Sequence, residues 1–235
     1  MTIFAQAKSI SQKMKKLFLI LFLIAAVSLQ AQHKAFQFGF KGGASLGWFK
    51  SDNDTYENDG VQFGGSWGFV ADIFLMENYS FTTGFNVLYL NGSISNEAIY
   101  EDEDGKPIDG TAYTKYKPKY LQLPVIFTMK TNNINDKLRI YGQIGYGLAF
   151  LLSSKQDFKF ISNEGDVIAE ATTDTDDFTS TRSSLILGVG VEVPLHKSTY
   201  LRTGFTFDNC FVDVAKQDFI KIKSNFIELS AAVIF

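Results

Sequence analysis

The feature that most constrains the fold of this chain is a two-residue alternation of side chains, repeated over eight stretches. In residues 36–48 the even positions, from Phe36 to Trp48, are apolar or glycine, and the odd positions are Gln, Gly, Lys or Ser. Such alternation is typical of a β-strand with one apolar face. The other stretches are residues 63–75, 79–89, 120–130, 138–150, 184–195, 201–211 and 226–235. The chain is therefore predicted to be all-β.

The length of these stretches separates a membrane sheet from a soluble one. Several run to about 12 residues or more, whereas about 9–11 residues cross a bilayer and a typical soluble strand has about five or six. Lipid offers no partner to a backbone N–H or C=O, so only helices and closed barrels span it. No segment after residue 31 approaches the roughly twenty apolar residues of a spanning helix. A closed transmembrane barrel follows from this comparison.

The last stretch, FIELSAAVIF, ends the chain on Phe235. An open, apolar terminal strand would invite aggregation, so we expect it to pair with the first stretch, residues 36–48, and close the barrel. The pairing must be antiparallel, because an even number of strands puts both termini on one side. We expect Phe235 to anchor the chain at the membrane border and to form part of a C-terminal signal for barrel assembly.

The connections between the stretches are unequal in length. Short turns follow the second, fourth and sixth stretches, whereas polar segments at about residues 51–60, 91–117, 153–181 and 212–221 follow the others. Outer-membrane barrels have this asymmetry, with short periplasmic turns and longer extracellular loops. The predicted fold is an eight-stranded antiparallel up-and-down barrel in the outer membrane, with both termini periplasmic and the long loops outside the cell.

An export signal precedes the barrel. Met14, Lys15 and Lys16 are followed by the apolar run LFLILFLIAAV and the small-residue exit SLQAQ. These are the parts of a secretory signal peptide, and the run is too short to span a membrane as a helix. We therefore assign residues 1–31 to an upstream extension and a signal peptide cleaved after Ala31, with Met14 as the expected start. Residues 32–235 form the barrel domain.

The inward-facing positions carry charges of both signs. They are Lys41, Asp72, Arg139, Glu192, Arg202, Asp208 and Glu228. An eight-stranded barrel is only wide enough for side chains to fill it, so a paired, space-filling polar core is expected. Glu192 and Arg202 lie symmetrically about a turn and should touch, with Arg139 at a similar height. A proton or ion path is the alternative use of these charges.

Few residues suit catalysis. His33 lies beside the cleavage site and His196 in a predicted periplasmic turn, away from the acids and hydroxyls that a general base would serve. Cys210 is the single cysteine, so neither an intrachain disulfide nor a cysteine zinc site can form. The acidic segments do not match a calcium-binding loop. We therefore predict no enzyme activity and no cofactor.

Charge also bears on the partners. Residues 1–31 hold four lysines and no acid, so their removal takes the net charge from −3 to −7. An acidic chain lacks the basic face that nucleic acid requires. The expected partners are outer-membrane lipid and the barrel-assembly machinery that inserts the strands.

Three segments carry a resemblance to a known family: the exit SLQAQ, the opening FGFKGGASLGW and the mid-chain KYLQLPVIFTMK. Together they resemble the PorT-like outer-membrane β-barrel family of Bacteroidota, over essentially the whole mature chain. The family's Y-L-x-[IL]-P element corresponds to Tyr120, Leu121, Leu123 and Pro124. Proline removes a donor from a strand ladder, so we expect a bulge at Pro124.

The resemblance implies a function without naming catalytic residues. The founding member is linked to protein secretion and gliding. The resemblance therefore implies a non-enzymatic structural or accessory role for this chain, with secretion-system proteins as partners. Two alternatives stay open: a narrow passive pore, and a barrel that binds a small ligand inside. A polar filled interior argues against both.

Overall fold

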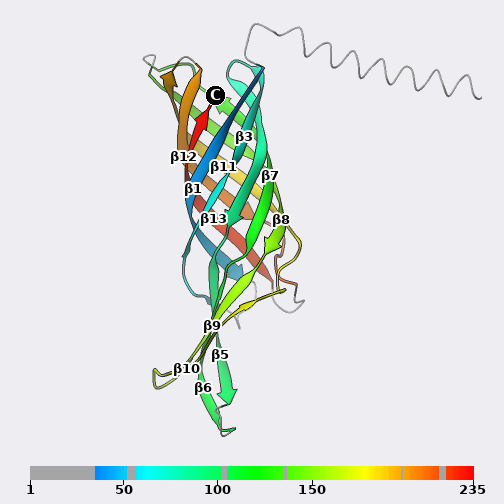
Figure 1. Cartoon of the computed structure of the whole chain (residues 1–235), viewed down its shortest axis with the longest axis vertical. Helices are drawn as coiled ribbons and strands as arrows, with labels where there is room; N and C mark the ends of the chain where they lie inside the picture. Colours follow the sequence, from blue (N-terminus) through cyan, green and yellow to red (C-terminus); the bar gives the residue numbers. More distant parts are fainter. Residues whose placement is uncertain (1–34, 52–56, 102–104, 135–136, 197, 217–220) are drawn as a thin grey trace, which may run out of the picture. The chain divides into compact units, whose positions relative to one another are not determined.

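The computed structural model describes residues 35–51, 57–101, 105–134, 137–196, 198–216 and 221–235. The predicted signal peptide lies outside these residues. The described residues form a closed barrel of eight strands, in the order β1-β13-β12-β11-β8-β7-β4-β3 (Figure 1). The barrel strands are β1 (Phe36–Ser51), β3 (Gln62–Met76), β4 (Tyr79–Tyr89), β7 (Lys119–Lys130), β8 (Arg139–Ser153), β11 (Thr181–His196), β12 (Thr199–Cys210) and β13 (Ile222–Ile234). The prediction of an eight-stranded antiparallel barrel is confirmed.

The barrel closes between its first and last strands. β1 and β13 pair antiparallel, with Ala44 opposite Leu229 near the middle of the ladder. The Phe235 N–H donates to the Phe38 carbonyl at 2.7 Å, and the centroids of these two rings lie 6.0 Å apart. The expected antiparallel pairing of the first and last stretches is therefore confirmed, and the chain leaves no open edge in the barrel wall.

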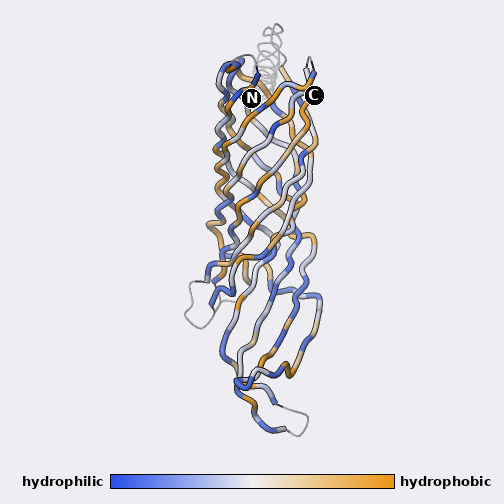
Figure 2. Tube along the Cα trace, turned by 90° about the vertical axis from the view of Figure 1, so that its left-hand side faces the viewer, coloured by the Kyte–Doolittle hydropathy of each residue, from blue (hydrophilic) through white to orange (hydrophobic). Residues whose placement is uncertain are grey.

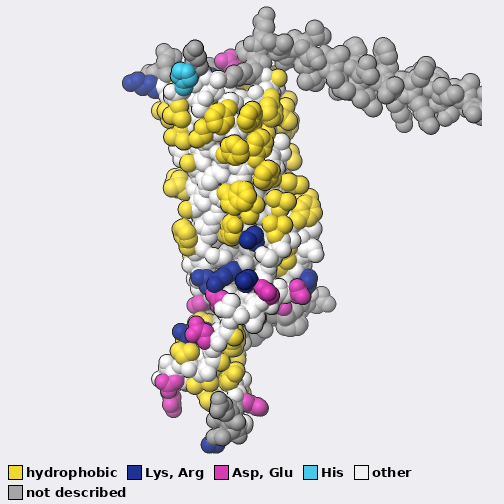
Figure 3. Space-filling model, viewed as in Figure 1, with side chains coloured by type: hydrophobic (Ala, Val, Ile, Leu, Met, Phe, Trp, Pro, Cys, Tyr) yellow, Lys and Arg dark blue, Asp and Glu magenta, His cyan; other side chains and the backbone are white. Residues whose placement is uncertain are grey.

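The outer surface of the barrel is apolar, as the alternation predicts. Phe40, Phe63 and Phe205 are each at least 59% exposed, whereas the residues between them on the strands point inward. Figure 3 shows hydrophobic side chains gathered in a broad band over the visible face of the barrel. A band of this kind matches the hydrocarbon layer of a bilayer. Within the described part of the chain, helices long and apolar enough to cross a membrane are absent.

A second sheet extends from one end of the barrel. Its described strands are β2 (Glu57–Asn58), β5 (Gly92–Glu101), β6 (Pro107–Tyr116), β9 (Lys155–Ser162) and β10 (Val167–Asp174), in the order β10-β9-β6-β5-β2. Figure 2 shows the chain running on from the barrel wall into this sheet. We call this end of the barrel the sheet end, and the end with the turns after β3, β7 and β11 the turn end.

The second sheet corrects the prediction of loops at about residues 91–117 and 153–181. Short breaks separate β4 from β5, β6 from β7 and β8 from β9, so three barrel strands continue into the sheet. The sequence signal is weaker here because this sheet carries many Thr, Lys, Asp and Glu side chains. One face still alternates, and Ile94, Ala112 and Phe160 on it are buried. Backbone pairing with neighbouring strands also stabilises the sheet.

The expected bulge at Pro124 is wrong. Thr82 opposite Ile126 and Asn86 opposite Gln122 keep the same register on both sides of the proline in the described β4–β7 ladder. Between these pairs the ladder is interrupted, because Pro124 has no N–H to donate. The Thr83 hydroxyl donates to the Pro124 carbonyl at 2.9 Å, and Gly84 takes a φ of +138°. A local gap in the ladder therefore accommodates the proline without an extra residue.

Candidate functional site

The interior of the barrel holds as many positive as negative side chains, and they form ion pairs. Among the described residues, eight charged side chains form ion pairs inside the barrel: Lys41, Lys130, Arg182, Arg202, Asp72, Glu192, Asp208 and Glu228. Four are positive and four negative, so their formal charges cancel. All are buried except Lys41, whose side chain is 19% exposed. Buried charges are tolerated when they are paired in this way.

Four of these residues form one cluster towards the turn end, which we call the lumen quartet: Asp72, Lys130, Glu192 and Arg202. Lys130 Nζ lies 3.1 Å from Asp72 Oδ2 and 2.9 Å from Glu192 Oε1. The Arg202 guanidinium contacts both carboxylates, with Nε at 2.7 Å from Glu192 Oε1. The four residues come from β3, β7, β11 and β12, so the quartet ties together strands that are not all neighbours.

Neutral side chains complete the hydrogen bonding of the quartet. The Thr82 hydroxyl donates to Asp72 Oδ1 at 2.5 Å and lies 2.7 Å from the Thr128 hydroxyl, to which Gln143 Nε2 donates at 3.0 Å. Lys130 Nζ also lies 4.9 Å from the centroid of the Phe74 ring, within the range of a cation–π contact. Satisfying the remaining lone pairs in this way is what makes a buried ion cluster tolerable.

A second ion pair lies nearer the sheet end. Arg182 Nη2 is 2.6 Å from Asp208 Oδ1 and donates to the Ser224 carbonyl at 2.7 Å, and Gln122 Nε2 donates to Asp208 Oδ2 at 2.9 Å. Both charged side chains are fully buried. The pair therefore lies in the buried interior, where Arg182 Nε and Nη1 have no hydrogen-bond partner among the described residues.

Between these groups lies a small cavity of about 50 Å³, lined by Lys41, Thr82, Tyr141 and Arg202 among others. Lys41 Nζ forms an ion pair with Glu228 Oε1 at 2.5 Å. A cavity of this size has room for ordered water, whereas a drug-sized ligand occupies roughly 300–1,000 Å³. This cavity is therefore too small for a ligand of ordinary size.

The structure brings six of the seven residues predicted for the lumen into these ion pairs, and Glu192 lies opposite Arg202 in register. Arg139 is the correction. It lies opposite Glu192 in the β8–β11 ladder, at the expected height, but it is the first residue of β8. Its side chain turns to the rim, where Nε donates to Asn133 Oδ1 at 2.7 Å and the guanidinium lies 6.0 Å from the Tyr200 ring.

Two members of the network were missing from the prediction. Lys130 takes the place expected of Arg139, and a signal for it existed, since it shares the inward parity of Gln122 and Thr128 on β7. The sequence does not predict Arg182 because the apolar alternation of the sixth stretch begins only at Ser184. Its even number gives it the same inward parity as Ser184 and Ile186, so extending that stretch by two residues would have found it.

The residues of the family element lie on both sides of the barrel wall. Tyr120 is fully buried and packs in an apolar cluster with Leu88, Leu90, Ala149 and Phe226. Leu121 and Leu123 face outward, and Pro124 lines the small interior cavity. The element therefore has a structural place, on a strand that forms both the lipid-facing surface and the core.

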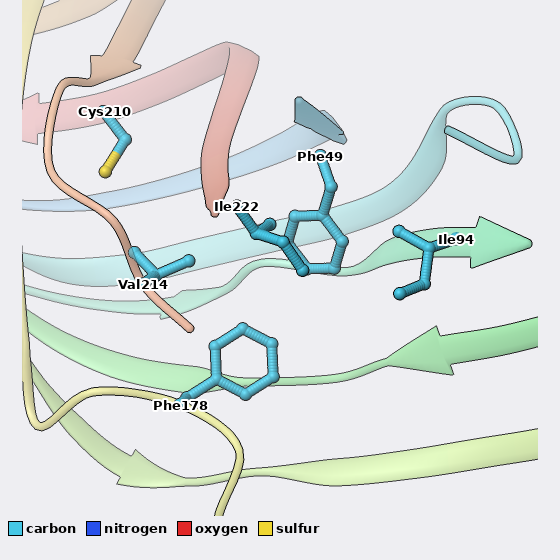
Figure 4. Packing of buried hydrophobic residues seen from close by; sticks show 6 residues of the cluster. All are labelled: Phe49, Ile94, Phe178, Cys210, Val214 and Ile222. Carbon is cyan, nitrogen blue, oxygen red and sulfur yellow. The ribbon is translucent and has the colours of Figure 1, made fainter. Parts of the chain in front are cut away.

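An apolar cluster lies at the sheet end of the barrel, and we call it the end cluster (Figure 4). Its buried members are Phe49, Ile94, Phe178, Cys210, Val214 and Ile222. The Phe49 ring lies 6.0 Å from that of Phe178 and 6.2 Å from that of Tyr116. The cluster joins β1, β12 and β13 of the barrel to β5 and to the segments around Phe178 and Val214. The end cluster therefore places apolar side chains between the charged interior and the second sheet.

The described residues offer no arrangement for metal chemistry. Groups of three or more His, Cys, Asp or Glu side chains that could hold a metal ion are absent from this part of the chain. His196 lies at the exposed end of β11, while His33 lies outside the described residues. Cys210 is buried, and its thiol donates to the Val212 carbonyl at 3.2 Å.

Comparison with known proteins gives one family and several structures. The profile of the family described as outer membrane protein beta-barrel domain matches residues 11–211. Among solved structures, Neisserial surface protein A is 14% identical over 86% of this chain and 96% of its own, with a TM-score of 0.49. A major outer membrane protein from Thermus thermophilus is 15% identical over 86% and 100%, with a TM-score of 0.41. OprG from Pseudomonas aeruginosa is 13% identical over 86% and 97%, with a TM-score of 0.39. The search of curated proteins found no match.

Proposed function

The chain belongs to the outer membrane protein beta-barrel domain family, and we propose that it is a non-enzymatic membrane support that displays the second sheet to other proteins. In this proposal the barrel holds the chain in the outer membrane. The five-stranded sheet is the surface that partners contact.

The observation that carries this proposal is the filled interior. Eight paired charges occupy the lumen of the described barrel, and the end cluster packs apolar side chains at the sheet end. A passive pore needs a continuous water path, and a ligand-binding barrel needs a larger cavity than about 50 Å³. The ordered structure that is left for an interaction lies outside the barrel, in the second sheet.

The orientation is part of the proposal. The connections at the turn end are short, whereas those at the sheet end include β5, β6, β9 and β10. Outer-membrane barrels place their longer connections outside the cell. We therefore assign the sheet to the extracellular side and both termini to the periplasm.

The partner class follows from the resemblance to PorT-like barrels, which implies an accessory role in protein secretion or gliding. The edge strand β10 supports a contact role, since Ala171, Thr172 and Thr173 on it are exposed. A strand edge presents unpaired backbone groups that another protein can use. We assign secretion-system proteins as the partners of this sheet.

A crosslinking experiment tests this proposal. A photoreactive amino acid at Thr172 on β10 should give a discrete protein adduct in living cells, identified by mass spectrometry as a component of the secretion apparatus. The same amino acid at Val125, which is 57% exposed on the lipid-facing side of β7, is the matched control and should give lipid adducts. Protein adducts at Val125 alone, or none at Thr172, would contradict the sheet as the contact surface.

We also propose that Phe235 forms part of the signal by which the barrel-assembly machinery recognises this chain. Deleting Phe235 should reduce insertion into the outer membrane of cells, measured by the heat-modifiable band on gels, more than it reduces folding in detergent. The residue is 44% exposed and packs on Phe38, so the loss of contacts is small. Phe235→Tyr should insert normally. Equal losses in cells and in detergent would point to a folding defect and not to recognition.

A further inference from the structure

The strand β10 lies at one edge of the second sheet, and one of its two sides is open (Figure 1). In the described part of the chain it pairs with β9 alone. The Thr175 N–H donates to the Ser154 carbonyl at 3.1 Å, which continues the β9–β10 ladder by one residue pair. On an antiparallel strand, successive residues turn their backbone N–H and C=O groups to opposite sides. Odd-numbered residues of β10 therefore direct these groups to β9, and the even-numbered ones direct them to the open side: Glu170, Thr172 and Asp174.

The side chains of these three residues share one face of the sheet with lysines of β9. Glu170 lies opposite Lys159 and Asp174 opposite Lys155. The side chains of Glu170, Thr172 and Asp174 are exposed. Positive and negative side chains thus alternate from β9 to β10 along two rows, and the next place in each row lies beyond the edge. A basic side chain at that place would extend the alternation, since opposite charges on neighbouring strands stabilise a sheet.

The charge of the second sheet favours a basic partner. Its described strands and their connections hold twelve Asp and Glu side chains against five Lys and no Arg, counted in residues 57–59, 92–101, 105–117 and 155–177. Six of these acids lie in residues 163–177, which contain β10 and carry neither Lys nor Arg. The surplus along the open edge is therefore negative.

The lysines of the sheet already lie beside acids. Lys117 forms an ion pair with Asp157, which also lies opposite Lys115 in the β6–β9 ladder. Lys115 and Lys159 line one groove together with Glu170. An acidic partner would have to compete with these carboxylates, whereas a basic partner meets acids that exceed the lysines in number.

The other face of β10 carries small side chains. Ala171 lies opposite Phe158 in register, and Ala169 lies opposite Phe160. Ala171 is exposed and Phe158 is half-buried. A small residue at the edge leaves room for a larger apolar side chain on an added strand. Such a side chain would cover Ala171 and remove more of the Phe158 ring from water, which stabilises the contact.

We propose that β10 binds an extended segment of another protein as a sixth strand of this sheet. The segment runs antiparallel to β10, with basic side chains opposite Glu170 and Asp174 and an apolar one opposite Ala171. The inference deepens the proposed function and rests on it for the sheet as the contact surface. Adding a strand to an open edge is a known mode of peptide recognition, in which backbone hydrogen bonds give affinity and alternate side chains give specificity.

A second copy of the chain fits this edge poorly. Antiparallel pairing of two β10 strands about Thr172 would place Glu170 of one copy opposite Asp174 of the other. Like charges directly opposite each other destabilise a sheet. The same repulsion acts between two copies of the acidic segment 163–177. The occupant is therefore a different chain, with basic side chains.

Fluorescence anisotropy of a labelled peptide, titrated with the full chain in lipid nanodiscs, tests the inference. The probe TKTTVKT sets its lysines opposite Asp174 and Glu170 and its valine opposite Ala171. The variant Thr172→Pro removes one open N–H, leaves the bonds to β9 in place, and should weaken binding roughly tenfold. The same probe with an N-methyl group on the threonine opposite Thr172 should lose about as much, because its backbone cannot donate there.

Two charge variants test the side chains. Glu170→Gln/Asp174→Asn should bind the probe roughly fivefold more weakly than the wild type. The matched control Glu97→Gln/Glu101→Gln removes the same charge from exposed positions of β5 and should bind like the wild type. A probe with glutamate in place of both lysines should show no measurable binding. Heat-modifiability on gels verifies that each variant is folded.

Four outcomes would overturn the inference. They are no binding of the probe at millimolar concentration, unchanged binding when Thr172→Pro or the N-methylated probe is used, equal losses in the two charge variants, and a dimer of the chain crosslinked through Thr172. The crosslinking experiment at Thr172 in cells decides the proposed function separately. Probe binding without an adduct from the secretion apparatus would contradict the proposed function alone, and such an adduct without probe binding would contradict the inference alone.

Discussion

The variant Asp72→Asn is expected to lose about 3–5 kcal/mol of its free energy of unfolding, since removing one partner of a buried ion cluster leaves the others uncompensated. Asp72 is 1% exposed and contacts both Lys130 and Arg202. The amide keeps the shape of the side chain but removes its charge. Two cations would then share Glu192 alone, in an interior where water cannot solvate the excess charge.

Reversible urea unfolding in lipid vesicles, followed through Trp48 and Trp67 fluorescence, measures this loss. The control Glu164→Gln removes a negative charge from an exposed position in the β9–β10 turn and should change stability by no more than about 0.5 kcal/mol. Combining Asp72→Asn with Lys130→Met should cost less than the sum of the single losses, because it restores neutrality. Additive losses would mean that the lumen quartet is not energetically coupled.

The second large effect is expected from Phe49→Ala, at about 3–5 kcal/mol of the free energy of unfolding. Phe49 is 1% exposed and lies at the centre of the end cluster, with Phe178 and Tyr116 as ring neighbours. Truncation leaves a cavity among side chains that belong to β1, β5, β13 and two connecting segments. These elements cannot all move inward together, so the cavity stays open.

The same urea measurement applies to this variant. Ile99→Ala is the matched control, since Ile99 lies on the second sheet with 68% of its surface exposed and should change stability by no more than about 0.5 kcal/mol. Equal effects of the two truncations would show that the end cluster contributes no more to stability than an exposed side chain.

Much of the barrel was predictable from the sequence because lipid and a narrow lumen impose opposite demands on alternate residues. In β1, Phe38 and Phe40 must face hydrocarbon, whereas Gly39 between them must leave room for the side chains inside the barrel. This contrast between neighbouring residues predicts the strand, the face that each side chain takes and the register with the neighbouring strands. The same parity placed Asp72, Glu192 and Arg202 in one interior.

The second sheet obeys a weaker rule. Its strands alternate too, with Ala112 opposite Phe160 on a buried face, but the many polar residues around them make the pattern fainter. Pairing with neighbours far along the chain decides their structure. The end cluster was missed for a related reason. Phe178 and Val214 lie in connecting segments, and only the tertiary fold brings them to Phe49.

Strand ends set the other limit. Arg139 has the right parity and height for the lumen, yet a terminal residue can turn its long side chain to the rim and to Asn133. Lys130, at the end of β7, instead reaches inward to Asp72 and Glu192. Whether a residue stands at an odd or an even position predicts the face of the strand on which its Cβ lies. It does not predict which way a long, flexible side chain turns at the end of a strand.

Planar-bilayer conductance of the purified full chain tests the central claim, a sealed barrel that supports an external sheet, most directly. With a neutral, filled lumen and the end cluster at the sheet end, the protein is expected to give no steady single-channel openings at any voltage that the bilayer tolerates. An outer-membrane porin reconstituted in the same lipid verifies that the assay detects insertion. Reproducible openings of one defined size would contradict the account and establish the barrel as a pore.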